Sequence, residues 1–138
     1  MSKLISKNDR ILIVGAKGLA GSAILRAFKK NNYGNSKNGG LLLTPSRKDL
    51  NLMNKKDVES WISINKPQVV VIAAGKVGGI YANYSQPTEF LLENIQIELN
   101  LIQSAWKNGV KRLLFLGSSC IYPKDVNFPI KEESFLEG

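Results

Sequence analysis

The chain has 138 residues, of which 43% are hydrophobic and 22% charged, a composition typical of one soluble globular domain. The single cysteine excludes an internal disulfide framework, and the absence of histidine removes the commonest metal ligand, so we expect a reducing, cytoplasmic setting and no metal site. The net charge of +8 is concentrated in residues 1–80, which hold 14 Lys and Arg against 4 Asp and Glu. A phosphate-rich ligand, a nucleic-acid surface and a solvated lysine-rich face would each explain this excess.

The first half of the chain alternates between short apolar runs and helical patterns. Strands are predicted at residues 11–14, 41–44 and 69–74, because these runs are continuously apolar, as in a parallel sheet covered on both faces. Helices are predicted from Leu19 onward and at residues 54–65, with a surface loop of Asn and Gly at 33–40. This β-α-β-α-β order with right-handed crossovers builds a parallel sheet.

The second half continues the alternation once. Residues 75–86 are predicted to form a long connection, followed by a helix from Pro87 to Asn108 with Ser85 as a possible cap. A fourth strand is predicted at residues 111–116, after which the composition turns polar and acidic. We therefore expect an α/β fold, a Rossmann-like doubly wound parallel sheet truncated after about four strands. Residues 1–138 would form one incomplete domain.

Three glycines with the spacing GxxGxxG lie between the first strand and the first helix. Gly15 permits a tight turn, Gly18 lets the backbone approach a pyrophosphate, and Gly21 allows the helix to pack closely on the strand. The helix N-terminus adds free amide groups and a positive dipole end. These features predict a dinucleotide site.

The residues after the second strand indicate which dinucleotide is bound. A site for NAD needs an acidic residue there, but Arg47 and Lys48 come before any acid, which favours the 2′-phosphate of NADP(H), and Lys17 adds a further positive charge. Arg47 and Lys48 could also be merely solvated loop residues. The expected cofactor contacts are Gly15, Lys17, Gly18, Leu19, Gly21, Arg47, Asp49, Leu50, Ala73, Ala74 and Lys76.

The helix predicted from Pro87 to Asn108 carries two apolar stripes, which together exceed the apolar arc of a surface helix. One stripe comprises Leu91, Ile95, Leu99, Ile102 and Trp106, and the other Phe90, Ile97, Leu101 and Ala105. One stripe should face the sheet, and a partner subunit or the remainder of a larger domain should cover the other.

Four motifs together carry a family resemblance: the glycine loop, DLNL at residues 49–52, AGKVGGI at 74–80 and LLFLGSSCIYPK at 113–124. In these the chain resembles the amino-terminal part of the GDP-L-fucose synthase family, within the extended short-chain dehydrogenase/reductases. The resemblance implies NADPH-dependent 3,5-epimerisation and 4-reduction of GDP-4-keto-6-deoxy-D-mannose. It also implies that the full-length protein is a homodimer that pairs through the helix of residues 87–108.

The resemblance assigns catalytic roles to two residues after the fourth strand. Ser118 matches the serine that hydrogen-bonds the keto oxygen, and Cys120 matches the epimerisation acid/base, whose thiol can exchange a proton beside a ketone. The family's Tyr-x-x-x-Lys motif is expected to be missing, since Tyr122 is followed by Pro, Lys, Asp and Val. The histidine that pairs with the cysteine is also missing. We therefore expect this chain alone to fold poorly or bind cofactor weakly, and not to turn over.

Two other functions remain open. Another nucleotide-sugar epimerase, reductase or dehydratase of the same superfamily is one, although Cys120 and the cationic residues after the second strand argue against a 4-epimerase that holds NAD. A non-catalytic NADP-binding fragment is the other. We expect no nucleic-acid partner, because no aromatic residues interleave with the basic ones, and no membrane partner, because no apolar run is long enough.

Overall fold

The computed structural model describes residues 5–135, and within them four strands form one parallel sheet. The strands are β1 (Arg10–Val14), β2 (Leu41–Leu43), β3 (Val69–Ile72) and β4 (Arg112–Phe115). Their order in the sheet is β2-β1-β3-β4, so β1 and β3 are central. This order, with parallel pairing throughout, confirms the Rossmann-like fold predicted from the sequence.

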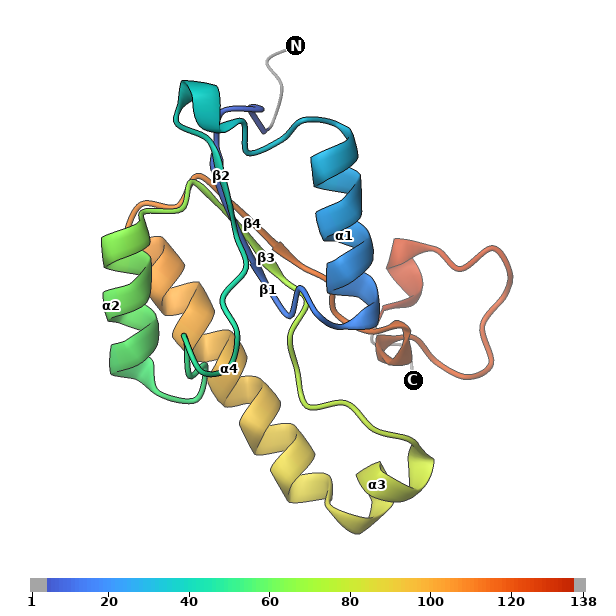
Figure 1. Cartoon of the computed structure of the whole chain (residues 1–138). Helices are drawn as coiled ribbons and strands as arrows, with labels where there is room; N and C mark the ends of the chain where they lie inside the picture. The colour runs from blue at the N-terminus through green and yellow to red at the C-terminus, as the bar shows by residue number, and fades with distance from the viewer. Residues whose placement is uncertain (1–4, 136–138) are drawn as a thin grey trace.

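Helices cover both faces of the sheet, as Figure 1 shows. Helix α1 (Leu19–Lys30) lies on one face, and α2 (Lys55–Asn65) and α4 (Pro87–Lys107) lie side by side on the other. The loops that leave the carboxyl ends of β1, β3 and β4 all emerge at the lower edge of the sheet in this view. In an open α/β sheet this edge is where ligands bind.

The core forms two layers because successive strand residues point to opposite faces. On the α1 face, Ile11, Ile13, Val69 and Val71 pack against partly buried Ile24, Leu25 and Phe28. On the other face, strand residues including Leu12, Val14, Val70 and Ile72 pack against Val58, Ile62, Ile97, Leu101 and Ala105 of α2 and α4. Strands buried on both faces account for the continuously apolar runs in the sequence.

The structure corrects the predicted connection at residues 75–86, which contains a short helix, α3 (Ile80–Ser85). Ser85 is the last residue of α3 and not a cap: Gln86 precedes α4 and makes no side-chain capping bond. The cap of α2 is Asn54, whose side chain accepts hydrogen bonds from the amides of Lys56 and Asp57. The short helices η1 (Ser36–Asn38), η2 (Ser119–Ile121) and η3 (Glu132–Ser134) were also not predicted.

The predicted third strand is two residues too long at its carboxyl end. The β3 ladder ends at Ile72; Ala73 still donates its amide to the Val14 carbonyl, but the chain then leaves the sheet toward α4. Ala73 and Ala74 therefore belong to the loop at the sheet edge.

The two apolar stripes of α4 have different surroundings. Ile97, Leu101 and Ala105 are buried against the sheet, as one of the stripes should be. All residues of the other stripe are exposed, from 42% for Ile95 to 81% for Trp106. The side chains of β4 are also exposed. Among the described residues, no helix is long and apolar enough to cross a membrane.

Candidate functional site

The turn that follows β1 is built on glycine. Gly15 has φ of +82°, a left-handed conformation that favours glycine, and a Cβ there would overlap the Ala73 carbonyl oxygen at the end of β3. The Gly18 amide closes the turn by donating to the Gly15 carbonyl at 2.9 Å. The turn is therefore pressed directly against the backbone that leaves β3.

The start of α1 is open to solvent and carries no acidic residue in its first turn. Gly21 is buried, and a Cβ on it would overlap the Gly15 carbonyl oxygen, so this glycine lets the helix approach the turn. Gly18 precedes the helix without a side-chain cap, and the side chain of Leu19 is 94% exposed. Free amides, the positive dipole end and the lack of an acidic residue in the first turn suit this helix start to an anion.

The segment after β2 forms a compact turn held by Ser46 and Asp49. One Asp49 carboxylate oxygen accepts hydrogen bonds from the Ser46 hydroxyl at 2.6 Å and the Ser46 amide at 2.8 Å. These bonds lower the pKa of Asp49, and the positive charge of Lys17 lowers it further. The charge of Lys17, in the loop after β1, therefore acts on the turn after β2.

The other residues of this turn fall into two groups. Arg47 and Lys48 are exposed and form no ion pair within the described residues, so their charges are available to a ligand. Leu50 is only 4% exposed and its side chain lies in the core, because it packs with the cluster beneath α2 and α4. Only the backbone of Leu50 is therefore available for the predicted cofactor contact.

The loop after β3 is bound to α4. The side-chain amide of Asn94 accepts a hydrogen bond from the Lys76 amide at 2.7 Å and donates one to the Lys76 carbonyl at 3.0 Å. The Lys76 ammonium pairs with Glu93 at 2.6 Å and lies 5.2 Å from the centre of the Phe90 ring. Glu93 and Asn94 were not predicted as site residues, although a polar pair within an apolar helix was an available signal.

The segment that follows β4 leaves the sheet at the same edge as the glycine loop (Figure 1), and Ser118 and Cys120 belong to this segment. Gly117, with φ of +62°, turns the chain, and Ser118 caps η2 by accepting a hydrogen bond from the Cys120 amide at 3.2 Å. Both side chains are exposed, and the cysteine is free. The Ser118 hydroxyl keeps its own hydrogen to donate.

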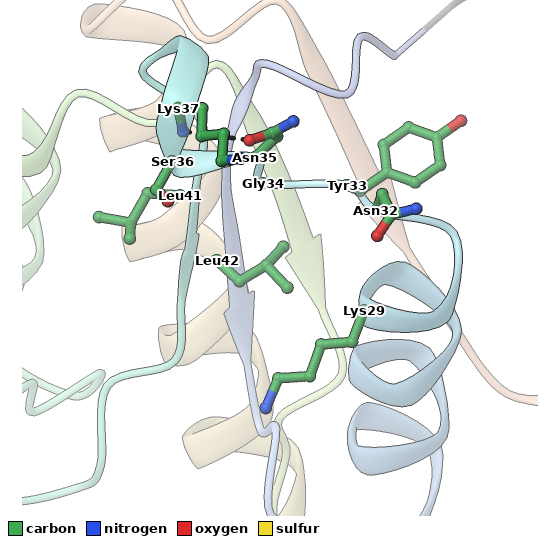
Figure 2. Close-up of a pocket in the computed structure, with 9 residues that line it drawn as sticks. All are labelled: Lys29, Asn32, Tyr33, Gly34, Asn35, Ser36, Lys37, Leu41 and Leu42. Carbon is green, nitrogen blue, oxygen red and sulfur yellow. Dashed lines mark hydrogen bonds between the residues drawn. The ribbon is translucent and has the colours of Figure 1, made fainter.

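The expectation that the chain has no Tyr-x-x-x-Lys spacing is wrong, because Tyr33 and Lys37 have it. Figure 2 shows both residues lining an open hollow with Lys29, Leu41 and other residues. This hollow lies beside the end of α1 and the start of β2, so the length of α1, about 15 Å from Leu19 to Lys29, separates it from the glycine loop. Tyr33 also packs edge-on against Phe28, with ring centroids 5.3 Å apart. This pair therefore cannot complete a site with Ser118.

The described residues contain no group of three or more His, Cys, Asp or Glu side chains that could hold a metal ion. The candidate site thus consists of the glycine loop, the turn after β2, the loop after β3 and the Ser118–Cys120 segment.

Residues 11–138 match the family model described as the NAD dependent epimerase/dehydratase family. The chain belongs to this family. Two curated relatives resemble it closely. GDP-L-fucose synthase 1 of Arabidopsis thaliana is 44% identical over 136 residues, or 99% of this chain and 40% of that protein. GDP-L-colitose synthase of Yersinia pseudotuberculosis is 41% identical over 129 residues, or 94% of this chain and 40% of that protein.

A solved structure of a reductase has a closely similar backbone. GDP-mannoheptose C4 reductase from Campylobacter jejuni, whose structure contains NADP, superposes with a TM-score of 0.85 at 34% identity, covering 97% of this chain and 40% of the other. The chain therefore spans about 40% of the length of each of these three proteins.

Proposed function

We propose that the chain is the NADP(H)-binding part of a GDP-sugar epimerase/reductase similar to GDP-L-fucose synthase. The observation that carries the proposal is that the glycine loop and the Ser118–Cys120 segment emerge at the same edge of the sheet. Relatives named for GDP-L-fucose synthesis, and a reductase structure with NADP, support this assignment.

The chain's residues fit NADP(H) on their own geometry. Cβ atoms at Gly15 and Gly21 would overlap backbone, so the turn keeps the close approach that a pyrophosphate needs. The open start of α1 binds the pyrophosphate, and Lys17 and Arg47 bind the 2′-phosphate. When bound, NADPH supplies the reducing equivalents for the C4 ketone of the sugar.

Ser118 and Cys120 carry the chemistry that this part of the enzyme contributes. The Ser118 hydroxyl donates a hydrogen bond to the keto oxygen and so stabilises the negative charge that develops there during reduction. The Cys120 thiol exchanges the proton on a ring carbon next to the ketone, which enolate formation acidifies. An exposed thiol in this role suits a reducing cytoplasm.

The proposal is tested by titrating the purified chain with NADPH and NADH and following the fluorescence of the reduced nicotinamide. We expect NADPH to bind more tightly than NADH, and no oxidation of NADPH when GDP-4-keto-6-deoxy-D-mannose is added. Turnover is not expected because the one Tyr-x-x-x-Lys spacing in the sequence lies away from Ser118. Failure to bind either dinucleotide would refute the proposal, and NADPH oxidation would refute the expected inactivity.

A second candidate is a reductase for a different GDP-sugar. The similarity to a colitose synthase and a mannoheptose reductase favours it, since the chain is 41% and 34% identical to these two proteins. Solvent deuterium distinguishes the candidates in an active, longer form of the enzyme, because only an epimerase exchanges the ring protons next to the ketone. A non-catalytic NADP-binding module would bind NADPH and give neither exchange nor reduction.

The exposed stripe of α4 is the proposed dimer contact. Five large apolar side chains on one helix face exceed what a solvated helix normally exposes, and a second copy of the same helix would bury them.

A further inference from the structure

The loop of residues 73–79 is joined to α4 by side-chain hydrogen bonds and an ion pair. Asn94 binds both backbone polar groups of Lys76, and Glu93 binds its ammonium group. Gly75 fits tightly beneath this helix, since a Cβ on it would lie 3.0 Å from the Asn94 side-chain oxygen. We call the contacts of Lys76 with Glu93 and Asn94 the Lys76 latch.

The Lys76 latch lies close in sequence to the residue that contacts the glycine loop. Ala73, three residues before Lys76, is the residue whose carbonyl group is in contact with Gly15. A shift of the backbone at Lys76 would therefore move the surface on which the Gly15 turn rests. In the sheet, β3 lies between β1 and β4, so its loop starts between the strand that leads to the glycine loop and the strand that leads to Ser118.

The side chain of Lys76 points to α4. Its ammonium group has Glu93 at 2.6 Å and the Phe90 ring at 5.2 Å, and the Lys76 side chain is only 26% exposed. A lysine that bound a cofactor phosphate would have to give up this ion pair. This geometry argues against the direct cofactor contact that the sequence suggests for Lys76.

We propose that Lys76, Glu93 and Asn94 are positioning residues, through which α4 fixes the loop after β3 and with it the pyrophosphate-binding turn. The inference rests on the proposed NADP(H) function. It assigns Lys76 a role in site geometry, where the sequence suggests a role in cofactor contact.

The test compares Lys76→Met, Glu93→Gln and the double variant in NADPH titrations of the whole 138-residue chain. If the latch positions the loop, each single variant raises the NADPH dissociation constant about threefold, the range of a partly exposed ion pair, and the double variant raises it no further. If Lys76 contacts the cofactor directly, Lys76→Met weakens binding while Glu93→Gln leaves it unchanged or strengthens it. That second pattern would overturn the inference.

The Lys107–Glu59 pair provides a matched control, because it also joins α4 to another element, at 3.1 Å, but lies away from the loop. Glu59→Gln should leave the NADPH dissociation constant unchanged. An equal loss of affinity in Glu59→Gln and Glu93→Gln would mean that any lost ion pair on α4 weakens binding through stability alone, which would also overturn the inference.

Asn94→Ala removes both backbone contacts and should raise the NADPH dissociation constant about tenfold, as expected for two lost hydrogen bonds. Its effect on adenosine 2′,5′-bisphosphate, which has no pyrophosphate, should be much smaller. A merely destabilising change would weaken both ligands alike, and that result would contradict a positioning role.

Hydrogen exchange separates failure of the latch from failure of the proposed function. In the ligand-free chain, Asn94→Ala should speed exchange of the Lys76 amide at least tenfold relative to amides of β1, whether or not NADPH binds. A wild-type chain that binds no NADPH refutes the NADP(H) function and the pyrophosphate-positioning part of the inference. Unchanged exchange at Lys76 refutes the latch itself.

Discussion

The contact between the glycine turn and the end of β3 can be measured with two glycine substitutions. Gly15 and Gly39 both have a positive φ, of +82° and +81°. A Cβ at Gly39 meets nothing within 4 Å, whereas one at Gly15 would overlap the Ala73 carbonyl oxygen and lie 2.8 Å from the Ala74 nitrogen. Gly39→Ala therefore measures the backbone strain alone, and Gly15→Ala measures the strain plus the contact.

The expected magnitudes follow from these two terms. An alanine in the left-handed region costs about 1–2 kcal/mol, which is the full cost expected for Gly39→Ala. Overpacking adds about 1–3 kcal/mol at Gly15, with the upper end favoured because the obstructing atoms are backbone and cannot rotate away. Gly15→Ala should thus lower the free energy of unfolding by about 2–5 kcal/mol, a large share of the stability of a small domain.

Urea unfolding followed by tryptophan fluorescence measures both variants, since Trp61 packs against the core. Gly15→Ala should also lose NADPH binding under conditions where it remains folded, while Gly39→Ala should bind normally. Equal losses of unfolding free energy in the two variants would refute the reasoning, because they would show that the turn does not press on β3.

Three further predictions concern other parts of the molecule. Arg47→Ser should raise the dissociation constant for NADPH about tenfold or more, the range of a lost charge-assisted hydrogen bond, and leave that for NADH unchanged in parallel titrations; equal effects on both would contradict a 2′-phosphate contact. The hydrogen bonds that Asp49 accepts from Ser46 lower the pKa of Asp49 in the folded chain. These bonds should therefore be fully formed above the ordinary aspartate pKa of about 3.9, and they should be lost as the pH falls through the lower pKa of the folded chain. An NMR titration of the Ser46 amide should show this step in the wild type and not in Asp49→Asn, and a step of the same size in both would disprove the assignment. Leu99→Glu should convert a dimer to a monomer in sedimentation at micromolar concentration, and a wild-type chain that is already monomeric would leave the exposed α4 stripe without this explanation.

The fold could be predicted because each strand and each long helix leaves its own pattern of apolar residues within one short stretch of the sequence. Strands such as residues 69–72 are buried on both faces and therefore appear as uninterrupted apolar runs. The two stripes of α4 follow from helical period alone, and burial of Ile97 and Leu101 confirms the one that faces the sheet. Helix α3 could not be predicted, because its six residues are too few to show a helical period.

The site could be predicted only in part, for a related reason. The glycine positions follow from a turn within a few residues, and φ of +82° at Gly15 agrees with the tight turn expected there. The surroundings of Lys76 depend on residues 17 and 18 positions away, and on the rotation of α4 that brings Glu93 and Asn94 toward the loop. Leu50 is similar: its burial depends on the packing of α2 and α4 together.

The two halves of the site are supported unequally. The glycine turn joins β1, which has a strand on each side, and it is packed between α1 and the end of β3. Ser118 and Cys120 follow β4, which within the described residues pairs only with β3 and exposes every side chain. Since local opening occurs where few apolar contacts are buried, β4 and the segment after it should open more readily than the glycine turn. The turn proposed to bind NADP(H) is therefore held by the core of the chain, whereas the serine and cysteine proposed to act on the sugar follow a strand that is only weakly packed.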